Sequence, residues 1–178
     1  LSRNGEVPIG AVDYLDHLPV GVRRNSMQAM TDLSSSADAQ AYAGAFEQIL
    51  ATLRILRARG VQLIPGTDLG GSFAYHRELE LFTQIGYTPA EALRLATHDM
   101  ASYLGQEQQL GSIEKGKLAD FFLIQGDPTV DLKAIKAIQM VVKDGTIHFP
   151  AEIYPHFGIR PFAEAPQLAL PTIRTTQP

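Results

Sequence analysis

The chain has 178 residues, of which 45% are hydrophobic and 19% charged, with a formal net charge of −4 and no cysteine. Such a composition indicates a globular core and argues against disorder. Nucleic acid and anionic membranes are poor partners for a mildly acidic chain without a basic run, and no apolar run approaches the roughly 20 residues of a membrane span. Disulfides and thiolate ligands are excluded. We expect a soluble protein, with the cytoplasm slightly favoured.

The first clear element is a long helix. Residues 1–36 are predicted to be loop, with a short helix near Met27–Leu33. The serine run at 34–36, with Asp38, is typical of a helix start. Apolar residues then recur at three- and four-residue steps, and Gly60 is the expected end.

A βα unit follows. Val61–Ile64 is predicted to be a buried strand, the loop Thr67–Ser72 comes after Pro65 and Gly66, and a helix is expected over Phe73–Ile85. Ligands gather at the carboxyl ends of strands in parallel α/β folds. Asp68 is therefore a candidate for binding a metal or taking a proton from metal-bound water. The alternative is a turn or capping residue.

A third helix and a small β unit complete the pattern. Thr88, with Glu91 three residues later, predicts a capping box, and Gly105 is the expected helix end. Phe121–Ile124 is predicted to be a strand, and the Asp144–Gly145 pair predicts a two-residue β-hairpin.

Several separated motifs resemble the C-terminal portion of the amidohydrolase superfamily, and they are closest to its imidazolonepropionase and prolidase-like branch. In chain order they read PGTD, HRELELF, GYTPAEALRLATHDMASYLG, GSIEKGKLADFFLI, DP and VVKDG. The resemblance implies an α/β fold: the last units of a (β/α)₈ TIM-type barrel, incomplete here, with part of a small β-sandwich. We assign 1–110 to the barrel, 111–150 to the sandwich and 151–178 to a surface tail.

The resemblance also implies a metal-dependent hydrolase that cleaves a C–N bond, in a cyclic amide or a dipeptide, with a metal-activated water. The expected cofactor is a divalent metal, zinc first. The family's aspartate at the end of the last barrel strand corresponds to Asp68, which would touch the metal and carry the proton of the water. The family's His-x-His pair has no counterpart among the five histidines, which are His17, His76, His98, His148 and His156.

Length leads to the same expectation, because a (β/α)₈ barrel takes about 250 residues. We therefore expect the C-terminal part of a longer enzyme, with most metal ligands outside the chain. Its partners would be a small amide or peptide substrate, and either the missing N-terminal part of the barrel or a second copy. Uncovered strand edges of an open barrel favour such association.

Other polar residues have alternative interpretations. His76 could bind substrate or be structural, and His98 fits helix packing. The segment 70–72 could cradle an anion, although a flexible loop is the simpler interpretation. Lys117 and Asp120 are interpreted as structural ties between strand and turn. A run of charged residues is interpreted as a solvated helix face, and it comprises Arg77, Glu78 and Glu80.

Two alternatives to an enzyme remain open from the sequence. The chain could be a non-catalytic remnant or an assembly module that keeps the last barrel units. It could also be a small binding domain of an unrelated α/β class, which would require a complete, closed core within these residues.

Overall fold

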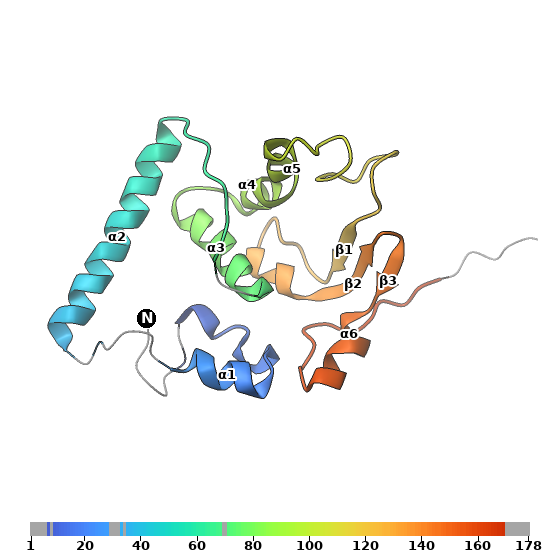
Figure 1. Cartoon of the computed structure of the whole chain (residues 1–178), viewed down its shortest axis with the longest axis horizontal. Helices are drawn as coiled ribbons and strands as arrows, with labels where there is room; N and C mark the ends of the chain where they lie inside the picture. The colour runs from blue at the N-terminus through green and yellow to red at the C-terminus, as the bar shows by residue number, and fades with distance from the viewer. Residues whose placement is uncertain (1–6, 8, 29–32, 34, 69–70, 170–178) are drawn as a thin grey trace, which may run out of the picture.

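The computed structural model describes residues 7, 9–28, 33, 35–68 and 71–169, and these combine helices with one small sheet (Figure 1). The α-helices are α1 (Val20–Ser26), α2 (Ser36–Ala58), α3 (Ser72–Gln84), α4 (Pro89–Arg94), α5 (Met100–Tyr103) and α6 (Pro150–Ile153). Single turns of other helix types are η1 (Ile9–Ala11), η2 (Leu15–His17), η3 (Leu95–Asp99), η4 (Leu132–Lys136) and η5 (Tyr154–Phe157). The strands are β1 (Phe121–Ile124), β2 (Ile138–Lys143) and β3 (Thr146–His148).

The three helices predicted from local signals are confirmed. α2 begins after Ser35, whose Oγ accepts a hydrogen bond from the backbone N–H of Asp38 at 3.0 Å. α4 begins after Thr88, with the full capping box to Glu91. It continues through the π-helical turn η3 into α5, so the predicted third helix is a single stretch. Each start satisfies backbone donors that a helix leaves unpaired.

Two local predictions are wrong. Val61–Ile64, expected as a buried strand, is irregular, with Val61 47% and Ile64 36% exposed. A strand forms by hydrogen bonding to a neighbour, and among the described residues this segment pairs with none. The short N-terminal helix lies earlier than expected, because α1 ends at Ser26. Part of the predicted Met27–Leu33 helix, residues 29–32, lies outside the described residues.

The sheet is antiparallel, with the order β1-β2-β3. The predicted hairpin joins β2 and β3 and is confirmed, because Lys143 pairs with Thr146 across a two-residue loop. Asp144 and Gly145 both have positive φ, 50° and 74°, as the tight hairpin turn that matches strand twist requires.

The hydrophobic core lies where α2, α3, the α4–η3 helix and η4 meet. Leu79 at the centre of α3 is completely buried. The core residues are Leu50, Leu79, Phe82, Ile85, Ala92, Leu95, Leu132 and Ile135. The last two belong to η4, on the segment between β1 and β2, so η4 fastens the sheet to the helices (Figure 1).

The segment after residue 149, predicted to be a surface tail, contains the helical turns α6 and η5. Further on, Ala163 is buried, and the Phe162 ring stacks on the His17 ring with centroids 3.4 Å apart. Phe73 of α3 joins this contact, with its ring centroid 5.6 Å from that of Phe162. Aromatic packing therefore ties the N-terminal turns, α3 and the tail together.

Candidate functional site

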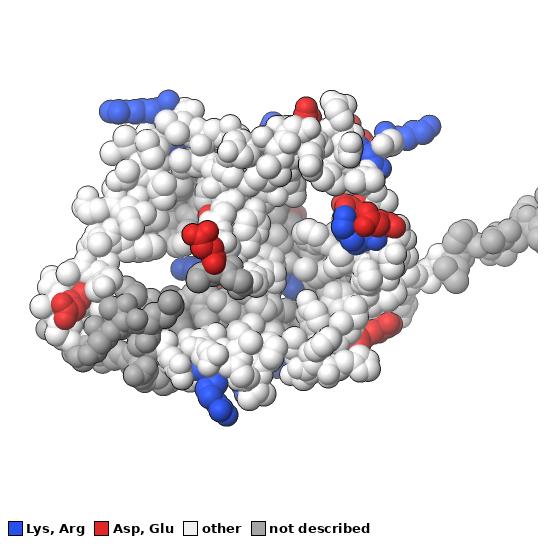
Figure 2. Space-filling model, in the orientation of Figure 1, with Lys and Arg blue, Asp and Glu red and all other residues white. Residues whose placement is uncertain are grey.

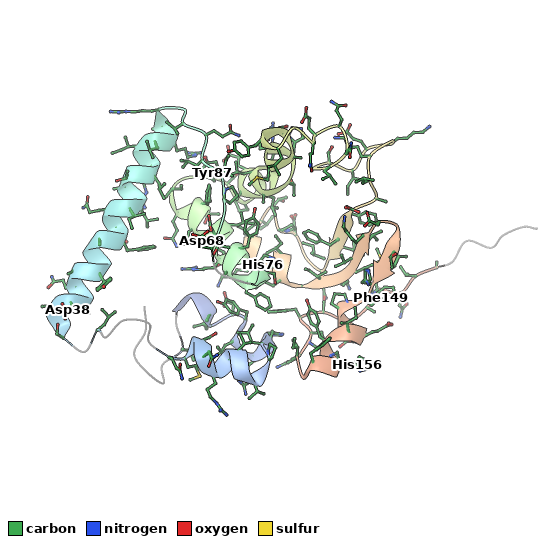
Figure 3. The ribbon with its side chains drawn as sticks, viewed as in Figure 1. Asp38, Asp68, His76, Tyr87, Phe149 and His156 are labelled. Carbon is green, nitrogen blue, oxygen red and sulfur yellow. The ribbon has the colours of Figure 1, made fainter. Side chains whose placement is uncertain are left out.

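The loop before α3 carries Asp68, an exposed residue two positions after Gly66. Pro65, where the loop begins, is buried. The backbone N–H of Gly66 donates a hydrogen bond of 2.8 Å to Oε1 of Glu78 on α3. Figure 3 shows Asp68 on this loop and His76 on the neighbouring helix. The loop is thus attached to α3 while the Asp68 carboxylate stays accessible to solvent.

His76, the predicted substrate-binding residue, is only 8% exposed. Its ring edge faces Phe73 at a centroid distance of 6.0 Å, and its Nδ1 has no hydrogen-bond partner among the described residues. Burial lowers its pKa to about 4, helped by the positive charge of Lys136 and opposed by Glu80. The imidazole is therefore neutral near pH 7. The structure places His76 and Asp68 on adjoining segments, with no hydrogen bond between them in the described part of the chain.

A buried ion network lies beside His76. Lys136 of η4 is 6% exposed, and its Nζ lies 2.5 Å from Oε1 of Glu80. The other oxygen of Glu80 accepts from Arg77 at 2.9 Å. The predicted solvated helix face is therefore wrong for Glu80, whose side chain is 12% exposed. The sequence signal that could have shown the burial of Glu80 is helical spacing. Glu80 lies one turn after His76, so both residues lie on the same face of α3.

The remaining histidines are dispersed. His98 pairs with the adjacent Asp99 at 3.0 Å. The His17 Nδ1 lies 2.7 Å from the accepting carbonyl oxygen of Arg160. His148 and His156 lie exposed, in β3 and η5 respectively.

A metal site would need several of these groups together. Over the described ranges, no three His, Asp or Glu side chains approach closely enough to hold a metal ion. Structural and catalytic sites for divalent metals draw at least three protein ligands in most cases. The described residues therefore do not form a metal site by themselves, and Asp68 fits the part of a single ligand at most.

The interpretation as a structural tie between strand and turn is confirmed for Asp120, whereas the contacts of Lys117 stay within one turn. Asp120 accepts from the Asp144 backbone N–H at 2.9 Å and from the Lys143 ammonium, so it braces the hairpin. Lys117 donates to the Ser112 hydroxyl at 2.5 Å, within its own turn. The segment 70–72, interpreted as a flexible loop with an anion cradle as the alternative, lies partly outside the described residues.

The face in Figure 2 carries acidic and basic side chains scattered over it, and it is hollowed beside α2. A shallow groove on α2 is lined by Gln48, Ile49, Thr52 and Leu53, and it does not include Asp68 or His76. No helix in the described ranges combines the length and the apolarity that a bilayer crossing demands.

Comparison with known proteins identifies the class. Residues 22–148 match the amidohydrolase family, and the chain belongs to this family. None of the curated proteins is significantly similar to it.

Solved structures place the chain near the prolidase-like members. A Xaa-Pro dipeptidase with methionine bound in its active site is 32% identical, with a TM-score of 0.54, over 58% of this chain and 26% of that one. A protein from Bifidobacterium longum assigned as a prolidase is 31% identical, with a TM-score of 0.52, over 67% and 28%. An amidohydrolase is 29% identical, with a TM-score of 0.51, over 56% and 25%. The match therefore spans about a quarter of these proteins' length.

Such neighbours have a TIM-barrel-type fold, and the family generally uses divalent metals. The resemblance predicted from the motifs is confirmed at the level of family and branch.

Proposed function

We propose that the chain is the C-terminal part of a metal-dependent amidohydrolase that cleaves a C–N bond in a small amide or a dipeptide. The supporting observation is the exposed carboxylate of Asp68, on a loop attached to α3, in a chain of this family. The similarity to a Xaa-Pro dipeptidase favours a dipeptide over a cyclic amide.

Asp68 would supply one carboxylate to a divalent-metal centre, zinc first, whose other ligands lie outside the chain. A divalent metal held there would make its bound water easier to deprotonate. Asp68 would take the proton of that water and return it to the leaving amine, a role that requires an accessible carboxylate. His76 remains a proposed substrate contact, and its burial means that α3 or its neighbours would have to move before it touched a ligand.

The test is Asp68→Asn in the longer protein, assayed for hydrolysis of a Xaa-Pro dipeptide. Losing a general base costs about 10² to 10⁴ in kcat, so we expect a loss of at least about 100-fold. Glu47→Gln, an exposed carboxylate on α2, is the matched control and should keep full activity. Activity of Asp68→Asn within a few-fold of the parent would rule out the proton-carrying role.

A second candidate is a non-catalytic remnant or assembly module, and it is favoured by the lack of a three-ligand cluster among the described residues. Metal content separates it from catalysis by this chain alone. Purified chain with stoichiometric zinc and amidase activity would contradict the remnant, whereas chain that binds no metal would support it.

A further inference from the structure

We propose that Glu78 is a positioning residue for Asp68, and this inference rests on the proposed function. Its carboxylate accepts the Gly66 N–H at 2.8 Å, two residues before Asp68. The Glu78 contact is therefore a direct connection between α3 and the loop that presents the proposed catalytic group. No substrate or metal contact is needed for this role.

The helix α3, to which Glu78 anchors the loop, is rigid. The next residue on α3, Leu79, is completely buried, and Glu80 after it is held by Lys136 and Arg77. The part of α3 from which the Glu78 side chain projects is therefore held firmly in the core.

At the loop end of the Gly66–Glu78 hydrogen bond, the backbone is itself constrained. Pro65 is buried and has a restricted φ, so the chain enters the loop in one direction. A Cβ at Gly66 would meet no atom within 4 Å, so the loop is not held there by packing. The hydrogen bond to Glu78 supplies the restraint that packing leaves out. A carboxylate acceptor makes this bond stronger than a neutral one would.

The Glu78 carboxylate also influences a second group on α3. The pKa of Tyr75, one helical turn before Glu78, is raised by burial and by the negative charge of Glu78. Tyr75 itself packs against the core. The negative charge of Glu78 is thus felt by a core-packed side chain of α3, while its carboxylate holds the loop.

The consequence for catalysis is geometric. A proton carrier must stay within hydrogen-bond reach of its partner, and small displacements lower the rate without abolishing substrate binding. Loss of the Glu78 contact should therefore lower kcat with little change in KM.

The first experiment measures amide hydrogen exchange at Gly66 in the full chain for Glu78→Ala and Glu78→Gln. Losing a hydrogen bond to a charged group should speed exchange about tenfold or more in the alanine variant. Glutamine keeps an acceptor oxygen, so it should restore most of the protection. Gln84→Ala, at an exposed position of the same helix, is the matched control. Unchanged exchange in Glu78→Ala would overturn the anchor.

The second experiment measures kcat and KM of the same variants in the longer protein. We expect kcat to fall about tenfold in Glu78→Ala and to recover in Glu78→Gln, with KM and the thermal midpoint close to the parent. Faster exchange with unchanged kcat would overturn the positioning role. If Asp68→Asn proves harmless, the proposed function fails, while the exchange result still decides whether Glu78 holds the loop.

Discussion

Because His76 is buried and neutral, the free energy of unfolding depends on pH. The pKa of His76 is lowered to about 4 by burial and by the nearby Lys136 charge, against the pull of Glu80, whereas an unfolded histidine titrates near pH 6.5. Between these values the unfolded chain binds more protons than the native one, so the free energy of unfolding is full above about pH 6.5 and falls toward pH 4.

We expect His76 to account for up to about 3 kcal/mol of this loss. Urea unfolding of the parent and of His76→Leu at several pH values between about 4 and 7 measures it, because leucine does not titrate. The variant should show a shallower slope against pH. Equal slopes would mean that the imidazole does not differ between the folded and unfolded states.

The buried pair of Glu80 and Lys136 permits a second prediction. Removing Lys136 leaves the largely buried Glu80 carboxylate with only Arg77 as its ionic partner, so Lys136→Met should lower the free energy of unfolding by about 2 kcal/mol. Adding Glu80→Gln removes that charge and should recover part of the loss. Denaturant melts of both single variants and the double variant give the coupling. A double variant as unstable as the sum of the two single variants would contradict the pairing.

At the scale of elements, the loop after α5 approaches the helix closely enough at Gly111 to exclude a side chain there. Gly111 has φ +88°, and a Cβ there would lie 2.7 Å from the Ala101 Cβ and 2.9 Å from the His98 Cα. Gly116 has φ +100° with nothing within 4 Å. Both alanine variants suffer backbone strain of about 1–2 kcal/mol, but only Gly111→Ala adds overpacking of about 1–3 kcal/mol. Chemical denaturation should therefore rank Gly111→Ala as the less stable, and equal losses would argue against the close approach.

Local signals account for the elements that the sequence predicts well. The Ser35 cap, the Thr88–Glu91 box and the Asp144–Gly145 turn each act within a few residues, so reading the chain alone finds them. The failed strand prediction at Val61–Ile64 has a different cause. A strand forms only when a neighbouring strand pairs with it, and the local sequence does not show whether one is present.

In the candidate site too, local features could be predicted from the sequence and long-range contacts could not. Glu80 is paired with a lysine 56 residues away, and Glu78 reaches 12 residues back to a backbone amide. No short pattern encodes either contact. Asp68 could be nominated because its loop follows an apolar run and precedes a helix, whereas the burial of His76 depends on how α3 packs.

At the scale of the molecule, α2 has an unpartnered apolar face. Tyr42, Phe46 and Ile49 are 44%, 41% and 56% exposed, and their spacing places them on one side of the helix. Among the described residues, α2 contributes Leu50 and Leu53, toward its C-terminal end, to the core, and the rest of the helix stands apart from the other labelled elements in Figure 1. Exposed apolar faces of this kind favour association.

We therefore expect the isolated chain to self-associate through this face of α2. Ile49→Glu should lower the weight-average mass measured by light scattering at high concentration, because a charge buried in an apolar contact is costly. Gln40→Glu, which adds the same charge on the opposite side of α2, should leave the mass unchanged. If the parent chain is a monomer at every concentration, α2 does not mediate self-association. If both variants lower the mass equally, general charge repulsion is responsible, and the Tyr42–Ile49 face has no special role.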